Sequence, residues 1–184
     1  DLAGTYTYTI TGVAPCPDSS ASVQVTVNPV PDAGNDGILA ICSNQNSVDL
    51  FASLSGTPQS GGTWSPALAS GSGIFNPALD TSGVYTYTIS GVLPCTDDTA
   101  TVTVTVTPGP EAGNDNTITL CVNSSSQDLA LLLGPNSQSG GTWSPALASG
   151  TGIFNPAVDV AGSYTYTLSG SQPCDNDSAV ITVI

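Results

Sequence analysis

The chain contains no lysine, arginine or histidine, although it has 14 aspartate and glutamate residues and a formal net charge of −14. No side chain can therefore neutralise a phosphate, which excludes nucleic-acid binding and adsorption to an anionic membrane surface. Salt bridges between side chains are impossible. Catalysis that depends on a basic side chain, such as a Ser-His-Asp triad or a Schiff base, is excluded as well.

Charged residues are scarce overall, at 8% of the chain against about 25% in an ordinary globular protein. The surface must therefore consist mainly of Thr, Ser, Asn, Gln and Gly. No apolar run is long enough to span a bilayer, and we expect no direct membrane insertion. We expect any export signal to lie upstream of residue 1. A self-repelling, negatively charged surface of this kind predicts an extracellular or cell-surface protein.

What the chain does contain is a long internal repeat without gaps. The repeat has a period of 79 residues. This spacing separates Cys16, Cys95 and Cys174 from one another in turn, Cys42 from Cys121, and Trp64 from Trp143. A period of this length is that of a small domain. We predict full units at residues 31–109 and 110–184, and the last third of a truncated unit at residues 1–30. We expect this to be a window on a longer array; the alternative is that the first fragment pairs with another chain.

Catalysis by a pair of carboxylates, as in glycosidases, is the route that the missing bases leave open. Asp97 and Asp98 are adjacent, but the counterpart of Asp97 in the next unit is Asn176. A general acid that a reaction needed would not be exchanged for an amide in a near-copy of the same segment. We therefore predict that the protein is not an enzyme.

The hydrophobic pattern of residues 31–109 alternates over short stretches bounded by Gly- and Pro-rich turns. We expect an edge strand at the linker, followed by strands at residues 38–42, 48–54, 63–65, 74–75, 83–90 and 99–107. In the stretch 48–54, Val48, Leu50, Ala52 and Leu54 would share one face. About seven short strands predict an all-β fold, a β-sandwich.

Aromatic side chains recur at fixed positions in the two full units. We predict that they belong to the core: Trp64, Trp143, Tyr85, Tyr87, Tyr164 and Tyr166. The alternative for the two tryptophans is an exposed platform on which a sugar stacks. The uncharged stretch Thr99–Thr107 would need a cover if it formed a sheet edge. Linkers, glycans or strands of other copies in a fibre could supply that cover.

Two cysteines per full unit predict one disulfide per unit. The expected pairs are Cys42–Cys95 and Cys121–Cys174, with Cys16 bonded to a cysteine upstream of residue 1. The alternative pairs Cys16–Cys42 and Cys95–Cys121 would join neighbouring units. Metal binding by these cysteines is not expected, because the chain has neither histidine nor a CxxC motif.

The order PDAGND, VDL, GGTW, GVYTYT and TATVTVTV in residues 31–109 resembles the immunoglobulin-like and PKD-like repeats of very long Bacteroidetes cell-surface adhesins. The resemblance covers the whole chain, unit by unit. It implies tandem immunoglobulin-like β-sandwich modules with a 79-residue repeat and a secreted stalk, adhesin or fibre. Trp64 is followed by Ser65-Pro66-Ala67 rather than by the WDFGDG-type segment of PKD domains, so no PKD-specific site is expected.

The same resemblance suggests two further kinds of site. Asp98-Thr99-Ala100 and Asp177-Ser178-Ala179 match the Asp-(Ser/Thr)-Ala type of O-glycosylation site that Bacteroidetes use, so Thr99 and Ser178 are candidates for modification. The segment from Asp80 to Tyr85 resembles the corner of immunoglobulin folds where a tyrosine hydroxyl bonds to backbone.

Acidic and amide side chains gather in the linkers and suggest calcium as a cofactor. Calcium takes six to eight oxygen ligands, commonly carboxylates and carbonyls. The candidate ligands are Asp32, Asn35, Asp36, Glu111, Asn114 and Asp115. The alternative is that these side chains form turns by bonding to the backbone.

These observations together predict a structural protein. We expect the shaft of a secreted cell-surface adhesin or extracellular filament, which gains length from repeated units and durability from disulfides. Its partners would be neighbouring modules and other copies in a fibre. The alternative function is an adhesion module that binds surface glycans or a receptor. The near-identity of Ser60–Leu79 and Ser139–Val158 favours the shaft, because binding loops should differ between units.

Overall fold

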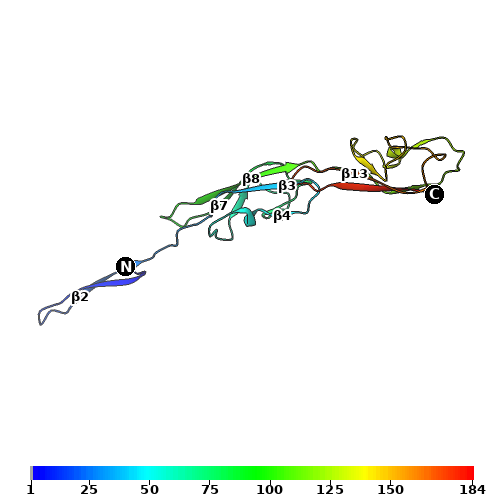
Figure 1. The fold of residues 1–184 in the computed structure, drawn as a ribbon. Helices are drawn as coiled ribbons and strands as arrows, with labels where there is room; N and C mark the ends of the chain where they lie inside the picture. Colours follow the sequence, from blue (N-terminus) through cyan, green and yellow to red (C-terminus); the bar gives the residue numbers. More distant parts are fainter. Residues whose placement is uncertain (1) are drawn as a thin grey trace.

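A computed structural model describes residues 2–184 as an extended, all-β chain. Asp1, the first residue of the predicted unit 1–30, lies outside the described residues. Figure 1 shows a β-hairpin at the N-terminal end, followed in line by two larger β-units. None of the helices in the described part has the length and apolarity that crossing a membrane requires.

The hairpin consists of β1 (Gly4–Ile10) and β2 (Ser19–Val25). The two strands are antiparallel, with Gly4 opposite Val25 and Ile10 opposite Ser19, and they form a two-stranded sheet by themselves. Alternating Thr and Tyr residues in β1 favour the extended conformation, because β-branched and aromatic side chains fit a pleated surface. Both strands are largely exposed to solvent.

The middle unit contains two open sheets, the arrangement of a β-sandwich. A four-stranded sheet has the order β3-β8-β7-β5, and a two-stranded sheet pairs β4 with β6. The bounds are β3 (Gly37–Cys42), β4 (Val48–Asp49), β5 (Thr63–Ser65), β6 (Ile74–Phe75), β7 (Gly83–Ile89) and β8 (Asp98–Thr107). Strand β3 runs parallel to β8, with Gly37 opposite Val102 and Cys42 opposite Thr107.

The C-terminal unit has the same arrangement. Its sheets have the orders β11-β13-β14-β9 and β10-β12. The bounds are β9 (Asn116–Ile118), β10 (Gln127–Asp128), β11 (Thr142–Ser144), β12 (Ile153–Phe154), β13 (Gly162–Leu168) and β14 (Asp177–Val183). Strand β9 is parallel to β14, as β3 is to β8. The predicted all-β class is therefore confirmed.

Each larger unit has its own hydrophobic core. Tyr85 and Tyr87 of β7 and Val102 and Val104 of β8 are buried in the first core, together with Phe75 of β6. The period-2 alternation of β7 and β8 explains this burial, because alternate side chains point to one face of the sheet. The threonines between them, such as Thr103, lie on the outer face.

The predicted strand at residues 48–54 is wrong after its first two residues. Strand β4 ends at Asp49, and a 3₁₀ helix, η1 (Leu50–Ser53), follows. The Asp49 side chain accepts a hydrogen bond from the Phe51 backbone N–H and so caps this helix. Ala52 is consequently exposed instead of facing the core. The C-terminal unit has an equivalent 3₁₀ helix, η2 (Leu129–Leu132), which Asp128 caps.

The stretch Thr99–Thr107, considered above as a sheet edge, is instead an interior strand. Strand β8 lies between β3 and β7, so both of its hydrogen-bonding sides face other strands. Its lack of charge therefore needs no cover from glycans or other chains. The edges of the four-stranded sheet are β3 and β5.

Candidate functional site

A disulfide between Cys42 and Cys174 joins the two larger units. Cys42 ends β3 of the middle unit, whereas Cys174 lies in the loop between β13 and β14 of the next unit. The Cα–Cα distance is 5.0 Å across a sequence separation of 132 residues. Both cysteines are buried. The bond therefore closes a covalent loop that contains most of both units.

The predicted pairs Cys42–Cys95 and Cys121–Cys174 are wrong, and so are the alternative pairs that would have joined Cys16 to Cys42 and Cys95 to Cys121. The register of β3 explains why. Cys42 lies opposite Thr107, the last residue of β8, whereas Cys95 comes just before β8 begins. The ten residues of β8 span roughly 30 Å, far beyond the Cα separation of about 4.4–6.8 Å that a disulfide tolerates.

Polar contacts around this junction hold the linker between the units in place. The Ser43 N–H donates to the Thr107 carbonyl at 2.9 Å, and the Gly109 N–H donates to Ser43 Oγ at 2.9 Å. Cys174 Sγ lies 3.5 Å from the Thr107 carbonyl oxygen and 3.6 Å from that of Pro108. The linker is thus fixed to the end of one unit and to the loop of the next.

The contact between the hairpin and the middle unit places a cysteine beside the equivalent carbonyl group, without a covalent bond. The Asn28 side-chain amide donates to the Leu93 carbonyl at 2.9 Å, and Cys95 Sγ lies 3.9 Å from the Asn28 carbonyl oxygen. Asn28 precedes Thr107 by one repeat, as Cys95 precedes Cys174. Cys95 is a free thiol, as are Cys16 and Cys121.

The recurring aspartates act as hydrogen-bond acceptors for the backbone. Asp80 accepts from the N–H groups of Ala69 and Asn76, each at 2.8 Å, and so ties the corner before β7 to a neighbouring loop. Asp159 makes the matching pair of bonds in the next unit. Aspartate favours such turns because its short side chain reaches nearby N–H groups.

The loop aspartate Asp97 accepts from the Gly91 N–H at 2.9 Å, and Asn176 accepts from the Gly170 N–H at 3.0 Å. The amide oxygen of asparagine serves this purpose as well as a carboxylate oxygen. The exchange of Asp for Asn between units is therefore explained by a structural role for this position.

The candidate calcium ligands lie at the two linkers, where several already have hydrogen-bonding partners. Asp32 accepts from the Gly34 N–H and the Thr57 hydroxyl, and Asp36 accepts from the Thr101 N–H at 2.7 Å. Asp115 accepts from the Val180 N–H in the same way. Asn35, Glu111 and Asn114 are exposed. Within residues 2–184, no group of three or more acidic or cysteine side chains is arranged to hold a metal ion.

The two tryptophans are half-buried at the rim of each core. Trp64 packs on Tyr87 with ring centroids 5.0 Å apart, and Trp143 packs on Tyr166 at 5.1 Å. The tyrosines are almost fully buried. The Tyr87 hydroxyl donates to the Gln59 carbonyl and accepts from the Gly62 N–H, both at 2.8 Å. Each tryptophan ring therefore packs on the core with one side and leaves its other edge exposed.

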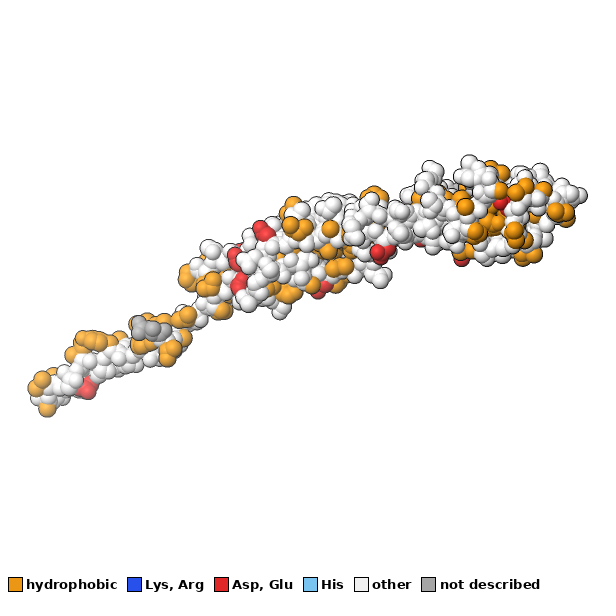
Figure 2. Space-filling view, in the orientation of Figure 1, with side chains coloured by type: hydrophobic (Ala, Val, Ile, Leu, Met, Phe, Trp, Pro, Cys, Tyr) orange, Lys and Arg blue, Asp and Glu red, His pale blue; other side chains and the backbone are white. Residues whose placement is uncertain are grey.

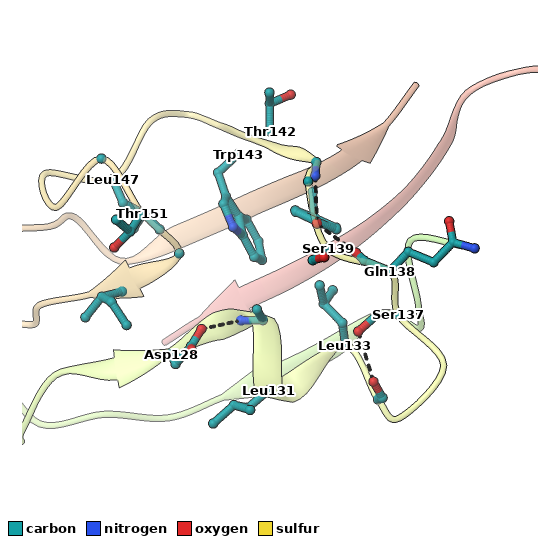
Figure 3. A pocket seen from close by; sticks show the side chains of 18 of the residues that line it. Asp128, Leu131, Leu133, Ser137, Gln138, Ser139, Thr142, Trp143, Leu147 and Thr151 are labelled. Carbon is teal, nitrogen blue, oxygen red and sulfur yellow. Dashed lines mark hydrogen bonds between the residues drawn. The ribbon is translucent and has the colours of Figure 1, made fainter. Parts of the chain in front are cut away.

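That open edge faces a hollow in each unit. In the C-terminal unit the hollow has a volume of about 960 Å³ and lies between η2, the loop after it and the segment around Thr151. Figure 3 shows Trp143 beside the hollow, with Leu131, Leu133 and Leu147 around it. The Trp64 hollow is smaller, about 530 Å³. A concave, mostly apolar surface with a few polar groups is the usual form of a site for a small ligand.

The predicted corner tyrosines bond to the backbone. The Tyr85 hydroxyl donates to the Thr81 carbonyl at 2.8 Å, and Tyr164 donates to Val160 at 2.7 Å. Burial raises the pKa of Tyr164, and the nearby charge of Asp159 adds to this rise. These residues are structural, since each hydroxyl is engaged inside its own unit.

The two candidate glycosylation sites lie on exposed strand positions. Thr99 is opposite Thr88 in β7, and Ser178 is opposite Thr167 in β13. The preceding aspartates, Asp98 and Asp177, accept from backbone N–H groups of the linkers. Both hydroxyl groups are thus accessible to a modifying enzyme, and an intact-mass measurement of native material tests whether they carry sugars.

Comparison with known proteins adds no family. No protein-family model matches the chain, and no curated protein matches it either. The sequence did hold one signal for the junction between units. The two cysteines of a unit flank its first and last strands, so parallel pairing of those strands places them at opposite ends.

Proposed function

We propose that the chain is part of the shaft of a secreted adhesin or extracellular filament, built from immunoglobulin-like modules with a 79-residue repeat. Three features support the module assignment. Strand β3 is parallel to β8, strands β8, β7 and β5 form an antiparallel series, and β4 pairs separately with β6. A tyrosine corner before β7 is a further mark of that fold.

The disulfide between Cys42 and Cys174 is the observation that carries the mechanical proposal. Tension applied to the two ends of the chain is transmitted from Cys42 directly to Cys174 through the disulfide bond. The residues between them, which include β4–β8 and β9–β13, are thereby removed from the loaded path. A binding module has no need of such a bypass, whereas a shaft under tension does.

The surface chemistry supports an extracellular location for this shaft. A disulfide persists in an oxidising compartment, and the chain offers trypsin-like proteases no lysine or arginine at which to cut. The short linkers contain proline, which restricts bending between units. The proposed partners are the neighbouring modules and other copies within a fibre, and no catalytic role is proposed.

Immunogold electron microscopy of the source cells tests this proposal. An antibody raised against the purified chain should label fibres that project from the cell surface, at intervals along their length. Small-angle X-ray scattering of the oxidised chain should give the profile of a rod. Label confined to the cell interior, or the scattering profile of a compact globule, would overturn the shaft.

A second candidate function is glycan binding at the tryptophan hollows, favoured by the half-buried Trp143 that lines the larger of them. Stacking of a sugar on that ring should quench or shift the tryptophan fluorescence during titration with an oligosaccharide library. Trp143→Phe replaces the indole by a smaller phenyl ring and is the control: the fluorescence change caused by the sugar should be lost in this variant. If no sugar changes the fluorescence, the hollows are clefts of the packing alone.

A further inference from the structure

The hairpin exposes an apolar face that the other two units bury. Tyr8 is 72% exposed, whereas Tyr87, its counterpart one repeat later, is 2% exposed. Val23 is 65% exposed, whereas Val102 is fully buried. Tyr6, Ile10 and Val25 show the same contrast with Tyr85, Ile89 and Val104. Figure 2 shows hydrophobic side chains gathered along the hairpin at the N-terminal end of the molecule.

In the middle unit, residues 31–79 provide the cover for this face. Phe51 and Trp64 contact Tyr87 with ring centroids 5.4 and 5.0 Å apart, and Phe75 contacts Tyr85 at 5.7 Å. Leu50, Leu54 and Leu68 complete the core from the same segment. Residues 110–158 cover β13 and β14 in the same way. Two copies of the interface therefore define what the hairpin lacks.

One edge of the hairpin is open at the place where β3 would pair. Strand β3 lies parallel to β8, with Gly37 opposite Val102 and Cys42 opposite Thr107. The corresponding positions of the hairpin strand are Val23 and Asn28. Among the described residues, β2 pairs only with β1. Its other edge offers backbone N–H and C=O groups to an added strand.

Cys95 occupies the position that a covalent link to such a strand requires. At the second junction Cys174 lies beside the Thr107 carbonyl and is bonded to Cys42, the residue opposite Thr107. At the first junction Cys95 lies beside the Asn28 carbonyl, and its thiol is free. A cysteine placed opposite Asn28 would therefore meet Cys95.

We propose that the hairpin is a docking surface for a polypeptide segment with the sequence pattern of residues 31–79, and that the cysteine of this segment forms a disulfide with Cys95. The segment adds its first strand parallel to β2 and buries Tyr6, Tyr8 and Val23 beneath its own apolar residues. A second copy of this chain is not the occupant, because its residues 31–79 already cover its own β7 and β8.

The covalent step is a thiol–disulfide exchange with glutathione disulfide as the oxidant. The Cys95 thiolate attacks glutathione disulfide and releases one glutathione. The thiolate of the incoming cysteine then attacks the mixed disulfide at the Cys95 sulfur and releases a second glutathione. The two thiols lose two protons and two electrons in total, and glutathione disulfide gains them.

The test uses the full chain and a synthetic peptide of residues 31–79, mixed in a glutathione redox buffer and followed by intact mass and peptide mapping. A seated peptide presents Cys42 to Cys95 at an effective concentration of about 1 mM, so peptide at about 10 μM should favour Cys95 over Cys16 and Cys121 by roughly 100-fold. Hydrogen exchange should show new protection of the β2 amides.

Two controls separate docking from simple thiol reactivity. A peptide with Leu50→Ser and Phe75→Ser keeps Cys42 but loses two buried contacts, and it should lose the preference for Cys95. The chain variant Tyr8→Asp should lose the peptide adduct while Cys95 still forms a mixed disulfide with glutathione.

An even spread of adducts over the three free cysteines would overturn the proposal, as would a dimer of the chain in place of the peptide adduct. Failure here leaves the rod proposal intact, because the rod depends on the bond between Cys42 and Cys174 and not on the hairpin.

Discussion

Removal of the disulfide between the units should greatly increase the length by which the molecule extends under tension. The double substitution Cys42→Ser and Cys174→Ser removes the bond and replaces each cysteine by a side chain of similar size. It returns the enclosed chain to the loaded path between the termini. The single substitution Cys95→Ser is the matched control, because it removes a thiol at the equivalent loop position without touching the disulfide.

The magnitude follows from the length of the loop. A separation of 132 residues at about 3.3–3.6 Å per extended residue corresponds to roughly 440–480 Å of chain. The cysteines themselves are 5.0 Å apart between Cα atoms, so nearly all of this length is hidden while the bond is intact. Closing a loop of this size should also stabilise joint folding of the two units by about 5 kcal/mol on the chain-entropy estimate.

Single-molecule force spectroscopy with handles at the two termini measures this length directly. The oxidised chain should release only the residues before Cys42 and after Cys174, which include the hairpin, β3 and β14. The double variant should release about 450 Å more. The reduced wild-type chain should match the double variant, and Cys95→Ser should match the oxidised chain. Equal extension of the oxidised and reduced wild-type chains would refute the load-bypass reasoning.

Three further predictions concern the acidic side chains and one tyrosine. Asp80→Ala leaves two backbone N–H groups without their acceptor and should cost about 1–3 kcal/mol in urea unfolding, whereas Asp175→Ala in an exposed loop should cost about 0.5 kcal/mol or less; equal costs would contradict this role. Because Asp32 and Asp36 already accept protein donors, a chelator should leave the melting temperature unchanged, and a fall would establish the calcium site. Burial raises the pKa of Tyr164 above its usual 10.0. The stability that the neutral Tyr164 hydroxyl contributes is therefore fully present below pH 10.0 and is lost as the pH rises through the folded-state pKa. Alkaline unfolding curves that do not differ between wild type and Tyr164→Phe would disprove this.

The strands could be predicted because their signal is local. Alternation in GVYTYTI and in TATVTVTVT requires only that one face of each stretch be apolar, and β7 and β8 follow it closely. The prediction failed at Leu50–Ser53. The sequence there still suggests the alternation of a strand, but Asp49 caps a 3₁₀ helix. A side-chain oxygen that bonds two residues ahead competes with the extended conformation, and hydrophobic periodicity does not register that competition.

The roles of the aspartates were only half predictable. Their recurrence at the same place in each repeat marked them as constrained, and both calcium binding and turn formation were consistent with that. Asp36 accepts from Thr101, 65 residues away, and Asp80 bridges two loops. Such partners become visible only when distant segments are placed together.

By itself, the sequence determined the all-β class of the fold and showed a segment pattern that recurs along the chain. These follow from composition, from the alternation of apolar and polar residues within strands, and from the long repeat. The disulfide partner was decided by tertiary structure. Parallel pairing of β3 with β8 carries Cys42 to one end of its unit and leaves Cys95 at the other. A disulfide forms only where two sulfur atoms meet in space, so no count of cysteines per unit could reveal that the bond crosses between units.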